Sequence, residues 1–512
     1  MKHTDFLKLL LLVIFGITGA FGFPPWGLTP LTLIAVAGLG LIIASASPFR
    51  AAFHTWIMFS AQNFVALNWI SEAFLVVYPE MGLSAFAPVF CLSAGLGTIP
   101  SLLVYAWGRL WPKNRTTLTA SMLGLSLFLS CAEWLTGHVL TGFPWAITAL
   151  AASEIKLSQS AATFGAYGLG LLLLAPSLTF AGAFWDFLKN KRLPFGDVTL
   201  VGLPVILMSG SWILHSHPAP QLDANKIWPV IRLVQANTPQ REKWRPENRG
   251  VIFARHLALS EAPANGRLAA IIWPETATPF RVTEQPKLLA RIAKVAKAHQ
   301  GYVLLGTPAR ASNTSGLRGY NNSLIAVDSG GDIPLRYNKA HLVPGGEYVP
   351  FQNYLPLEKL VENRGSFTAG PGLQTFRLSN LPPFSPLICY EIIFPGEVVL
   401  KKDRPDWIIN ITNDAWYGNS AGPYQHLAIS RLRAIEEGLP LVRVANTGIS
   451  AAFDGKGREL GRIPLETSGF IDVALPPPEK PTLYSKFGDR IYLMLLIGLA
   501  IPSLGSGMFR RS

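Results

Sequence analysis

Three side chains in the sequence could together perform covalent catalysis. Glu275 lies in "IIWPETATP", Lys339 in "RYNKAHLVPGGEYVPF" and Cys389 in "PLICYEIIFP". Glu275 and Cys389 each follow an apolar run typical of a buried strand, and the ends of strands are where functional side chains are commonly displayed. The chain has three cysteines, and since Cys91 and Cys131 lie in long apolar segments, Cys389 is the one left for the polar part.

Taken singly, each of the three is more often a structural residue: a surface carboxylate, a solvated lysine or an inert buried thiol. Taken together they predict a cysteine nucleophile. The thiolate is the reactive form, and a carboxylate such as Glu275 can take the thiol proton as general base. Attack on a carbonyl carbon places negative charge on oxygen. The Lys339 ammonium and the backbone N–H of Tyr390, just after the nucleophile, can stabilise that charge.

The polar part of the chain, residues 217–489, is predicted to be an α/β layered domain. Apolar strands alternate there with helical stretches at 246–262, 284–299 and 421–438, and several hairpins intervene. This alternation is typical of a mixed sheet with helices packed on it. The segment 342–373 has no periodicity, and a loop of that length is more often a functional lid than a passive connection.

The remainder of the chain is predicted to be a membrane domain. Mean hydropathy is +0.30 and only 15% of residues are charged, which is low for a surface in contact with water. A bilayer span takes about 20 apolar residues. Eight stretches close to that length lack Asp, Glu, Lys and Arg: Leu9–Trp26, Leu28–Ser47, Ala51–Ile70, Met81–Trp107, Thr116–Ala132, Thr163–Trp185, Val198–His215 and Ile491–Phe509. The predicted domains are therefore 1–216 with seven spans, 217–489, and 490–512 with the eighth span and a short tail.

Lysines and arginines in short loops set the predicted orientation, because they mark the cytoplasmic side. With the N-terminus inside, the short outer loops hold only Lys156. The inner segments hold Lys2, Lys8, Arg50, Arg109, Lys113, Arg115, Lys189, Lys191, Arg192, Arg510 and Arg511. Residues 217–489 then face outward, which in a bacterium is the periplasm, and both termini are cytoplasmic. These residues explain much of the net charge of +13, and no nucleic-acid motif occurs, so no nucleic-acid partner is expected.

The motifs as a set resemble known families. Glu275, Lys339 and Cys389, in this order, resemble the Glu-Lys-Cys triad of the nitrilase superfamily. The eight predicted spans, with the polar domain inserted before the last, and the motifs "GFPW", "WPETA", "GEYVPF", "ICYE" and "TNDAWYG" resemble the apolipoprotein N-acyltransferase family over essentially the whole chain.

This resemblance implies a nitrilase-like αββα catalytic domain in the bacterial inner membrane. It also implies the last step of lipoprotein maturation. An acyl chain would pass from a phospholipid, typically phosphatidylethanolamine, through a thioester on Cys389 to the α-amino group of a diacylglyceryl-cysteine in an apolipoprotein. An α-amino group has a pKa of about 8 and is partly neutral at pH 7, whereas a lysine side chain near 10.4 is much less available.

The resemblance assigns supporting roles as well. It implies that Glu347 supports the lysine and the glutamate of the triad, and that Glu391 shapes the site beside the nucleophile. Trp244 and Tyr390 match family positions implicated in activity, although each could be a packing aromatic. The residues expected at the pocket rim are Asn413 and Trp416.

One position departs from the family pattern. The family usually has Phe in Pro-Phe-Gly-Glu-Tyr, where this chain has Gly345. The loss of the aromatic ring would make the loop more mobile or alter a contact with an acyl chain, while the triad is untouched.

Two other interpretations use the same residues. A membrane-anchored amidase or nitrilase of small molecules would need the same triad, but seven leading spans exceed what an anchor requires. A transporter or receptor with a non-catalytic outer domain would not need the triad, and the few ionisable residues in the spans argue against ion coupling. No metal-ligand cluster, phosphate-binding glycine loop or dinucleotide fingerprint occurs, so no cofactor is expected.

Overall fold

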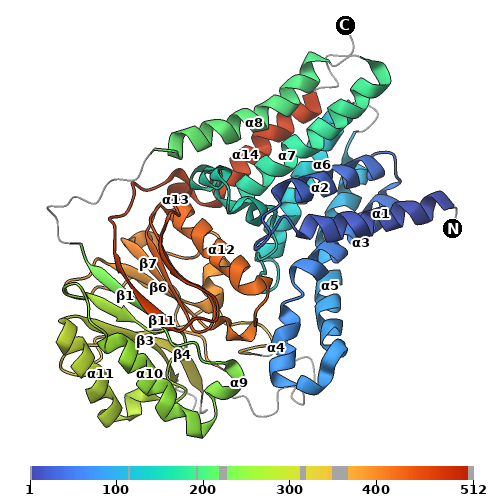
Figure 1. The fold of residues 1–512 in the computed structure, drawn as a ribbon. Coiled ribbons are helices and arrows are strands. Elements are labelled where there is room, and N and C mark those ends of the chain that lie inside the picture. The colour runs from blue at the N-terminus through green and yellow to red at the C-terminus, as the bar shows by residue number, and fades with distance from the viewer. Residues whose placement is uncertain are drawn as a thin grey trace. The chain divides into compact units, whose positions relative to one another are not determined.

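The computed structural model describes residues 3–112, 116–191, 194–217, 228–311, 319–348 and 367–505 (Figure 1). By its internal contacts the chain divides into two compact units. A helical unit comprises Met1–Pro218, Ser420–Glu437 and Pro481–Ser512, and an α/β unit comprises Ala219–Asn419 and Gly438–Lys480. The helix α12 (Ala421–Glu437) therefore groups with the helical unit, although its residues lie within the predicted range 217–489.

The helical unit has a helix at each of the eight apolar stretches. These are α1 (His3–Ala20), α2 (Thr29–Ile43), α3 (Pro48–Ala66), α5 (Phe86–Leu110), α6 (Leu118–His138), α7 (Ala161–Asn190), α8 (Phe195–His215) and α14 (Asp489–Gly505). Within the described ranges, four helical segments are long and apolar enough to cross a membrane: Pro79–Leu110, Leu118–His138, Lys156–Asn190 and Phe195–His215. The span count of eight stays a prediction. So does the predicted orientation, and six of its loop charges lie outside the described residues: Lys2, Lys113, Arg115, Arg192, Arg510 and Arg511.

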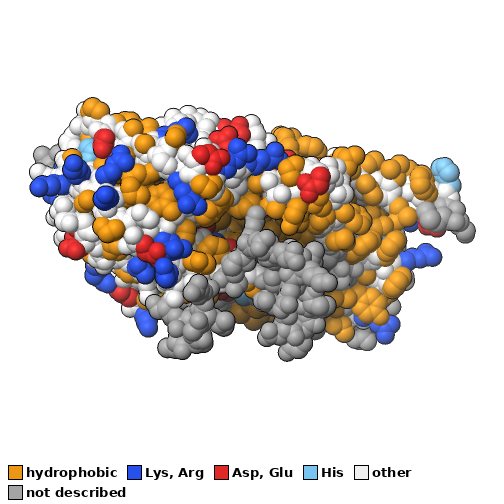
Figure 2. Space-filling view, turned by 90° about the horizontal axis from the view of Figure 1, so that it is seen from below, with side chains coloured by type: hydrophobic (Ala, Val, Ile, Leu, Met, Phe, Trp, Pro, Cys, Tyr) orange, Lys and Arg blue, Asp and Glu red, His pale blue; other side chains and the backbone are white. Residues whose placement is uncertain are grey.

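The surface of the helical unit is strongly apolar. Large exposed hydrophobic side chains are frequent along its helices, whereas Trp244, Val251 and Leu460 are the only ones among the described residues of the α/β unit. In the space-filling view, hydrophobic side chains cover much of the visible face of the helical unit, and charged side chains are spread over that of the α/β unit (Figure 2). A contiguous apolar surface of this kind marks contact with lipid or another protein. With its long apolar helices, the chain has the character of a membrane protein.

Two sheets form the α/β unit, as the alternation of strands and helices predicts. The first has the order β11-β1-β2-β3-β4-β5 and the second β10-β9-β8-β7-β6. The strands are β1 (Val230–Gln235), β2 (Ala270–Ile272), β3 (Tyr302–Arg310), β4 (Tyr320–Val327), β5 (Leu335–Asn338), β6 (Phe384–Ile388), β7 (Trp407–Thr412), β8 (Leu441–Ala445), β9 (Ser450–Phe453), β10 (Glu459–Ile463) and β11 (Gly469–Ala474). Buried residues of both sheets, such as Leu233, Leu304, Ile409 and Val444, share one core.

Helices α10 (Arg249–Glu261) and α11 (Pro286–His299) cover the other face of the six-stranded sheet (Figure 1). Their apolar sides, including Leu257 and Ile292, pack on Trp273 and Val303. The unit thus has a helical layer and two sheet layers, and the predicted α/β layered architecture is confirmed.

Strand direction places the functional residues. β6, β7 and β8 run parallel, with Ile388 paired to Ile411 and Thr412 to Ala445. The residues that follow these strands, Cys389 among them, therefore emerge at one edge of the sheet. In the other sheet β2 and β3 are also parallel.

Gly306 in β3 permits a close approach of the chain that carries Glu275. A Cβ atom at position 306 would lie 2.5 Å from the backbone nitrogen of Thr276 and 2.6 Å from the Cα of Glu275. Contacts this short with main-chain atoms require the backbone to shift. Glycine at this position therefore keeps the Glu275 corner against the sheet.

We expect Gly306→Ala to destabilise the protein. Overpacking of this type costs about 1–3 kcal/mol, and each kcal/mol lowers the melting temperature of a domain of this size by roughly 2–4 °C. Thermal unfolding of the full chain in detergent measures the effect. Gly469→Ala in β11 is the matched control, because nothing lies within 4 Å of its added Cβ. Equal melting temperatures for the two variants would contradict the packing argument.

Candidate active site

The structure brings Glu275, Lys339 and Cys389 together in the α/β unit. Glu275 follows the end of β2, Lys339 follows β5 directly, and Cys389 follows β6 directly. All three are buried, with 6%, 1% and 7% of their surface exposed. The Lys339 Nζ lies 3.8 Å from Glu275 Oε1, and both charges act on the Cys389 thiol.

Lys339 lies between two carboxylates. Its Nζ is 2.8 Å from Glu347 Oε2, a closer contact than that with Glu275. Asn322 on β4 joins the two carboxylates, because its Nδ2 donates to Glu275 Oε1 at 2.6 Å and to Glu347 Oε1 at 3.0 Å. The backbone N–H of Val343 donates to Glu347 Oε2 at 2.8 Å. The expected support of Lys339 and Glu275 by Glu347 thus has a direct geometric basis.

Burial and charge tune the three groups differently. Burial raises the pKa of Glu275, and the Lys339 ammonium opposes that rise. Burial alone would lower the pKa of Lys339, but Glu347 and Glu275 outweigh it, so the pKa is raised and the lysine stays charged. Burial, together with the charge of Glu275, raises the pKa of Cys389 to about 12. The resting nucleophile is therefore a thiol that needs a base, and Glu275 is a base with an elevated pKa beside it.

The backbone at the nucleophile is strained. Cys389 has φ of +54°, in the left-handed region that a non-glycine residue occupies at a cost of about 1–3 kcal/mol. Asn410 on β7 holds this corner, because its Nδ2 lies 3.4 Å from the carbonyl oxygen of Cys389. Arg443 NH1 donates to Asn410 Oδ1 at 2.6 Å, and its NH2 donates to Asp414 Oδ2 at 2.6 Å. A buried charged network thus supports the turn that presents the thiol.

Glu391 connects the turn at Cys389 to β5 and to the segment after it, which begins with Lys339. Its Oε2 accepts from the backbone N–H of Ile388 at 2.7 Å. Its Oε1 accepts from the Tyr337 hydroxyl at 2.8 Å and from the backbone N–H groups of Ala340 at 2.7 Å and His341 at 3.1 Å. Burial raises the pKa of Glu391, and these donors oppose the rise. The carboxylate therefore fixes the distance between two members of the triad.

The two aromatic candidates have different surroundings. Tyr390 is 5% exposed, and its ring packs edge-on against His341 and Phe394. Trp244 is 47% exposed and lies at the C-terminal end of the short helix α9 (Gln240–Lys243). Tyr390 thus has a packing role beside any backbone role, whereas about half of the Trp244 side chain is exposed.

Asn413 and Trp416 follow β7 and occupy different environments. Trp416 is half-buried in the short helix Asp414–Trp416. Asn413 is 5% exposed and bonded inward: its Nδ2 donates to Gln240 Oε1 at 2.8 Å, and its Oδ1 accepts from Asn446 Nδ2 at 3.1 Å. Asn413 therefore connects the end of β7 to α9.

The loop after Lys339 is described only in part. Gly345 has φ of +74° and its backbone N–H donates to the Tyr348 carbonyl at 2.8 Å. A side chain at this φ is strained even though a Cβ would meet nothing within 4 Å. The turn therefore suits glycine rather than the phenylalanine usual in the resembled family. Residues 349–366 of the predicted lid lie outside the described residues.

Sequence reasoning missed two buried residues of the site, Asn322 and Lys243. Asn322 lies inside an apolar strand, and a buried amide there is a detectable signal, because it needs partners. Lys243 lies among charged neighbours in "TPQREKW" and reads as a solvated charge. In the structure it is 1% exposed, and its Nζ donates to the Glu275 carbonyl at 3.1 Å.

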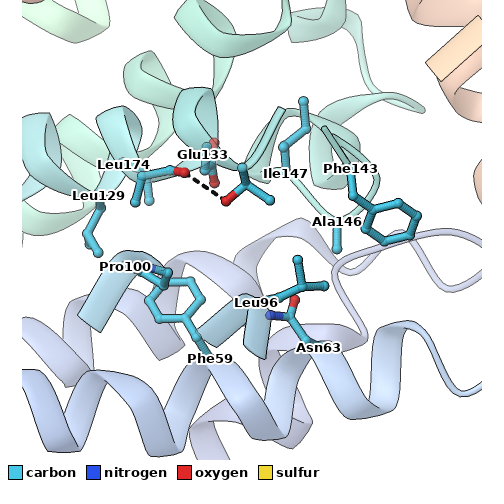
Figure 3. Close-up of a pocket in the computed structure, with 12 residues that line it drawn as sticks. Phe59, Asn63, Leu96, Pro100, Leu129, Glu133, Phe143, Ala146, Ile147 and Leu174 are labelled. Carbon is cyan, nitrogen blue, oxygen red and sulfur yellow. Dashed lines mark hydrogen bonds between the residues drawn. The ribbon is translucent and has the colours of Figure 1, made fainter. Parts of the chain in front are cut away.

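A separate pocket lies inside the helical unit. It is lined by residues of α3, α5, α6 and α7 and of the chain between α6 and α7, and its walls are mainly apolar, including Phe59, Leu96 and Phe143 (Figure 3). Glu133 is its one acidic lining residue. Glu133 Oε1 accepts from Thr148, and Oε2 has no hydrogen-bond partner among the described residues. An apolar pocket in a membrane-type bundle is suited to an aliphatic chain.

We expect Glu275→Gln to change how Cys389 reacts with iodoacetamide, in a background that lacks Cys91 and Cys131. With Glu275 present, the rate should fall as the pH drops through the raised pKa of that carboxyl, above its usual value of 4.5. This fall is the acidic limb of the pH–rate profile. Without the base, the acidic limb should disappear and the rate of alkylation at pH 7 should fall by about 10²-fold or more. Mass spectrometry of the alkylated peptide follows the reaction. Glu284→Gln on the surface is the control, and identical pH profiles for both variants would refute the role of Glu275.

Comparisons with known proteins match both units. A carbon-nitrogen hydrolase family model matches residues 230–479, and a model of the apolipoprotein N-acyltransferase N-terminal domain matches residues 15–179. Among solved structures, an amidase of the nitrilase superfamily from Nesterenkonia AN1, at 17% identity and a TM-score of 0.36, covers 48% of this chain and 90% of that chain.

Curated relatives match most of the chain. An apolipoprotein N-acyltransferase from Bradyrhizobium diazoefficiens is 37% identical over 84% of this chain and 79% of its own. One from Rhizobium rhizogenes is 34% identical over 96% of this chain and 94% of its own. On these matches, which span its helical and its α/β parts, the chain belongs to the apolipoprotein N-acyltransferase family.

Proposed function

We propose that this protein transfers an acyl chain from a phospholipid, through a thioester on Cys389, to the N-terminal amino group of diacylglyceryl-cysteine in apolipoproteins. The observation that carries the proposal is the buried cluster of Cys389, Glu275 and Lys339, in which a thiol, a base and a cation face one another. Family membership supplies the reaction class.

In the first half-reaction Glu275 takes the thiol proton as the sulfur of Cys389 attacks the ester carbonyl of the phospholipid. Negative charge develops on the carbonyl oxygen, and Lys339, which stays protonated, stabilises it together with the backbone N–H of Tyr390. The carbon–oxygen ester bond then breaks. The leaving lysophospholipid hydroxyl takes the proton from Glu275, and the acyl chain remains on sulfur.

In the second half-reaction the α-amino group of the apolipoprotein attacks the thioester. Glu275 takes a proton from the amine, and Lys339 again stabilises the oxyanion. The carbon–sulfur bond breaks, the thiolate regains its proton from Glu275, and an amide is formed. Exposed Trp244 and half-buried Trp416 are proposed to contact the lipid chains, while Glu347, Glu391 and Asn413 hold the reacting groups in place.

The setting of the reaction follows from its substrates. Taking an acyl chain out of a bilayer costs about 0.8 kcal/mol per CH₂, so the enzyme should meet its lipids at the membrane. We propose eight spans in the bacterial inner membrane, a periplasmic catalytic domain, cytoplasmic termini and phosphatidylethanolamine as donor. The apolar walls of the pocket beside Glu133 are proposed to contact part of an aliphatic chain. Exclusion of water would protect the thioester and favour transfer over hydrolysis.

Acylation of Cys389 is the direct test of this function. Purified protein mixed with phosphatidylethanolamine vesicles should gain one acyl group on the peptide that contains Cys389, and hydroxylamine should remove it. Cys389→Ala should show neither the adduct nor transfer to an apolipoprotein, because the thioester needs this thiol. Cys91→Ala is the matched control and should behave as the unsubstituted protein. Transfer at the normal rate by Cys389→Ala would refute the mechanism.

The proposed orientation is tested by labelling. In a background without Cys91, Lys294→Cys on the exposed side of α11 should react with a membrane-impermeant maleimide in intact spheroplasts, because the catalytic domain faces outward. Arg109→Cys at the end of α5 should react only after permeabilisation, because it is predicted to face the cytoplasm. Mass spectrometry or a gel shift reports both. The reverse pattern of labelling would overturn the orientation and leave the chemistry standing.

A further inference from the structure

A second buried lysine faces the proposed catalytic groups. Lys243 is the last residue of α9, and it is 1% exposed. Its Nζ donates to the backbone carbonyl of Glu275 at 3.1 Å. A lysine is almost never fully buried unless it is paired, so this placement calls for an explanation beyond packing.

The helix that carries Lys243 is anchored from within the site. Gln240, at the start of α9, accepts from Asn413 Nδ2 at 2.8 Å. Asn446 follows β8. Its Nδ2 donates to the Thr238 carbonyl at 2.7 Å, and its Oδ1 accepts from the Thr238 backbone N–H at 3.1 Å. The residues that follow β7 and β8 therefore hold one turn of chain, and that turn directs Lys243 inward while Trp244 stays exposed.

Lys243 interacts electrostatically with three titratable groups: Glu275, Cys389 and, from α10, His256. Burial lowers the pKa of Lys243 to about 8, and the charges of Glu275 and Cys389 oppose that shift. Burial lowers the pKa of His256 to about 4, so this imidazole is neutral near pH 7 and leaves the positive charge to the lysine. In turn, Lys243 acts to lower the pKa of Glu275.

We propose that Lys243 is a positioning residue for the proposed general base. Its ammonium holds the main chain of the Glu275 corner by hydrogen bonding to the Glu275 carbonyl. It also supplies a second positive charge, besides that of Lys339, which keeps Glu275 ionised and ready to accept the thiol proton. This inference rests on the roles proposed above for Glu275 and Cys389.

The test compares Lys243→Met, which removes the charge at similar length, with Lys243→Arg, which keeps it. The readout is alkylation of Cys389 by iodoacetamide across pH, in a background without Cys91 and Cys131. In Lys243→Met the acidic limb set by Glu275 should move to higher pH, and a rise of about 1 in the pKa of Glu275 would lower the rate on that limb about tenfold. Lys243→Arg should keep the limb near its original pH. Lys287→Met, on the exposed start of α11, is the control and should change nothing.

Two outcomes would overturn the proposal. One is an unchanged acidic limb in a folded Lys243→Met, even if the overall rate falls, because a purely structural role predicts that result. The other outcome concerns Lys243→Arg and is decisive if Lys243→Met fails to fold. If the acidic limb of the pH–rate profile moves to higher pH in Lys243→Arg, positive charge at this position does not set the pKa of Glu275. Alkylation by iodoacetamide needs no lipid. Failure of phospholipid to acylate Cys389 would therefore count against the proposed function, while the pH dependence of alkylation would still test the role of Lys243.

Discussion

Burying a cation between two anions is the constraint on which the catalytic unit depends. Lys339 is 1% exposed, and taking an ammonium out of water costs several kcal/mol unless charges and hydrogen bonds compensate it. Glu347 and Glu275 supply the charges, and Asn322 keeps the two carboxylates in place by donating to both. Removing Lys339 would leave two carboxylates without their cation, and removing either carboxylate would leave Lys339 with one anion fewer, so the position of each group depends on the others.

The same cluster determines the state of the nucleophile. Burial, together with the charge of Glu275, raises the pKa of Cys389 to about 12 and disfavours a free thiolate. In the proposed mechanism the proton therefore passes to Glu275 during attack. A protected thiol of this type is suited to an enzyme that holds a thioester, because a permanently ionised cysteine would be open to oxidation and side reactions.

Two supports fix the turn that presents the thiol, and both connect it to distant parts of the chain. Glu391 fastens the corner to the segment after β5, and the network of Asn410, Arg443 and Asp414 fastens it to β7 and β8. These contacts offset the unfavourable φ of Cys389. The helical unit contributes a different property, an apolar surface and an apolar pocket suited to lipid chains. This chain combines the two properties.

The sequence by itself determined the kinds of element and named the candidate reacting residues. Apolar length predicted the helices of the membrane-type unit, and alternation of strands and helices predicted the α/β architecture, because both depend on local periodicity. Glu275, Lys339 and Cys389 could be named because each follows a recognisable strand and because their order matches a family motif.

Only the tertiary structure decided how polar residues far apart in the chain share a buried space. Nothing in the local sequence marks Lys243 for burial, and the position of Asn322 in an apolar strand indicates only that its amide needs partners. The segments that pack on both residues come from elsewhere in the sequence. Asn413 was expected at a rim and is bonded inward, and Trp244 and Tyr390, equivalent from the sequence, differ in exposure. The physical reason is that hydropathy and spacing report which faces are apolar, whereas hydrogen bonds and charge pairs depend on distances that exist only after folding.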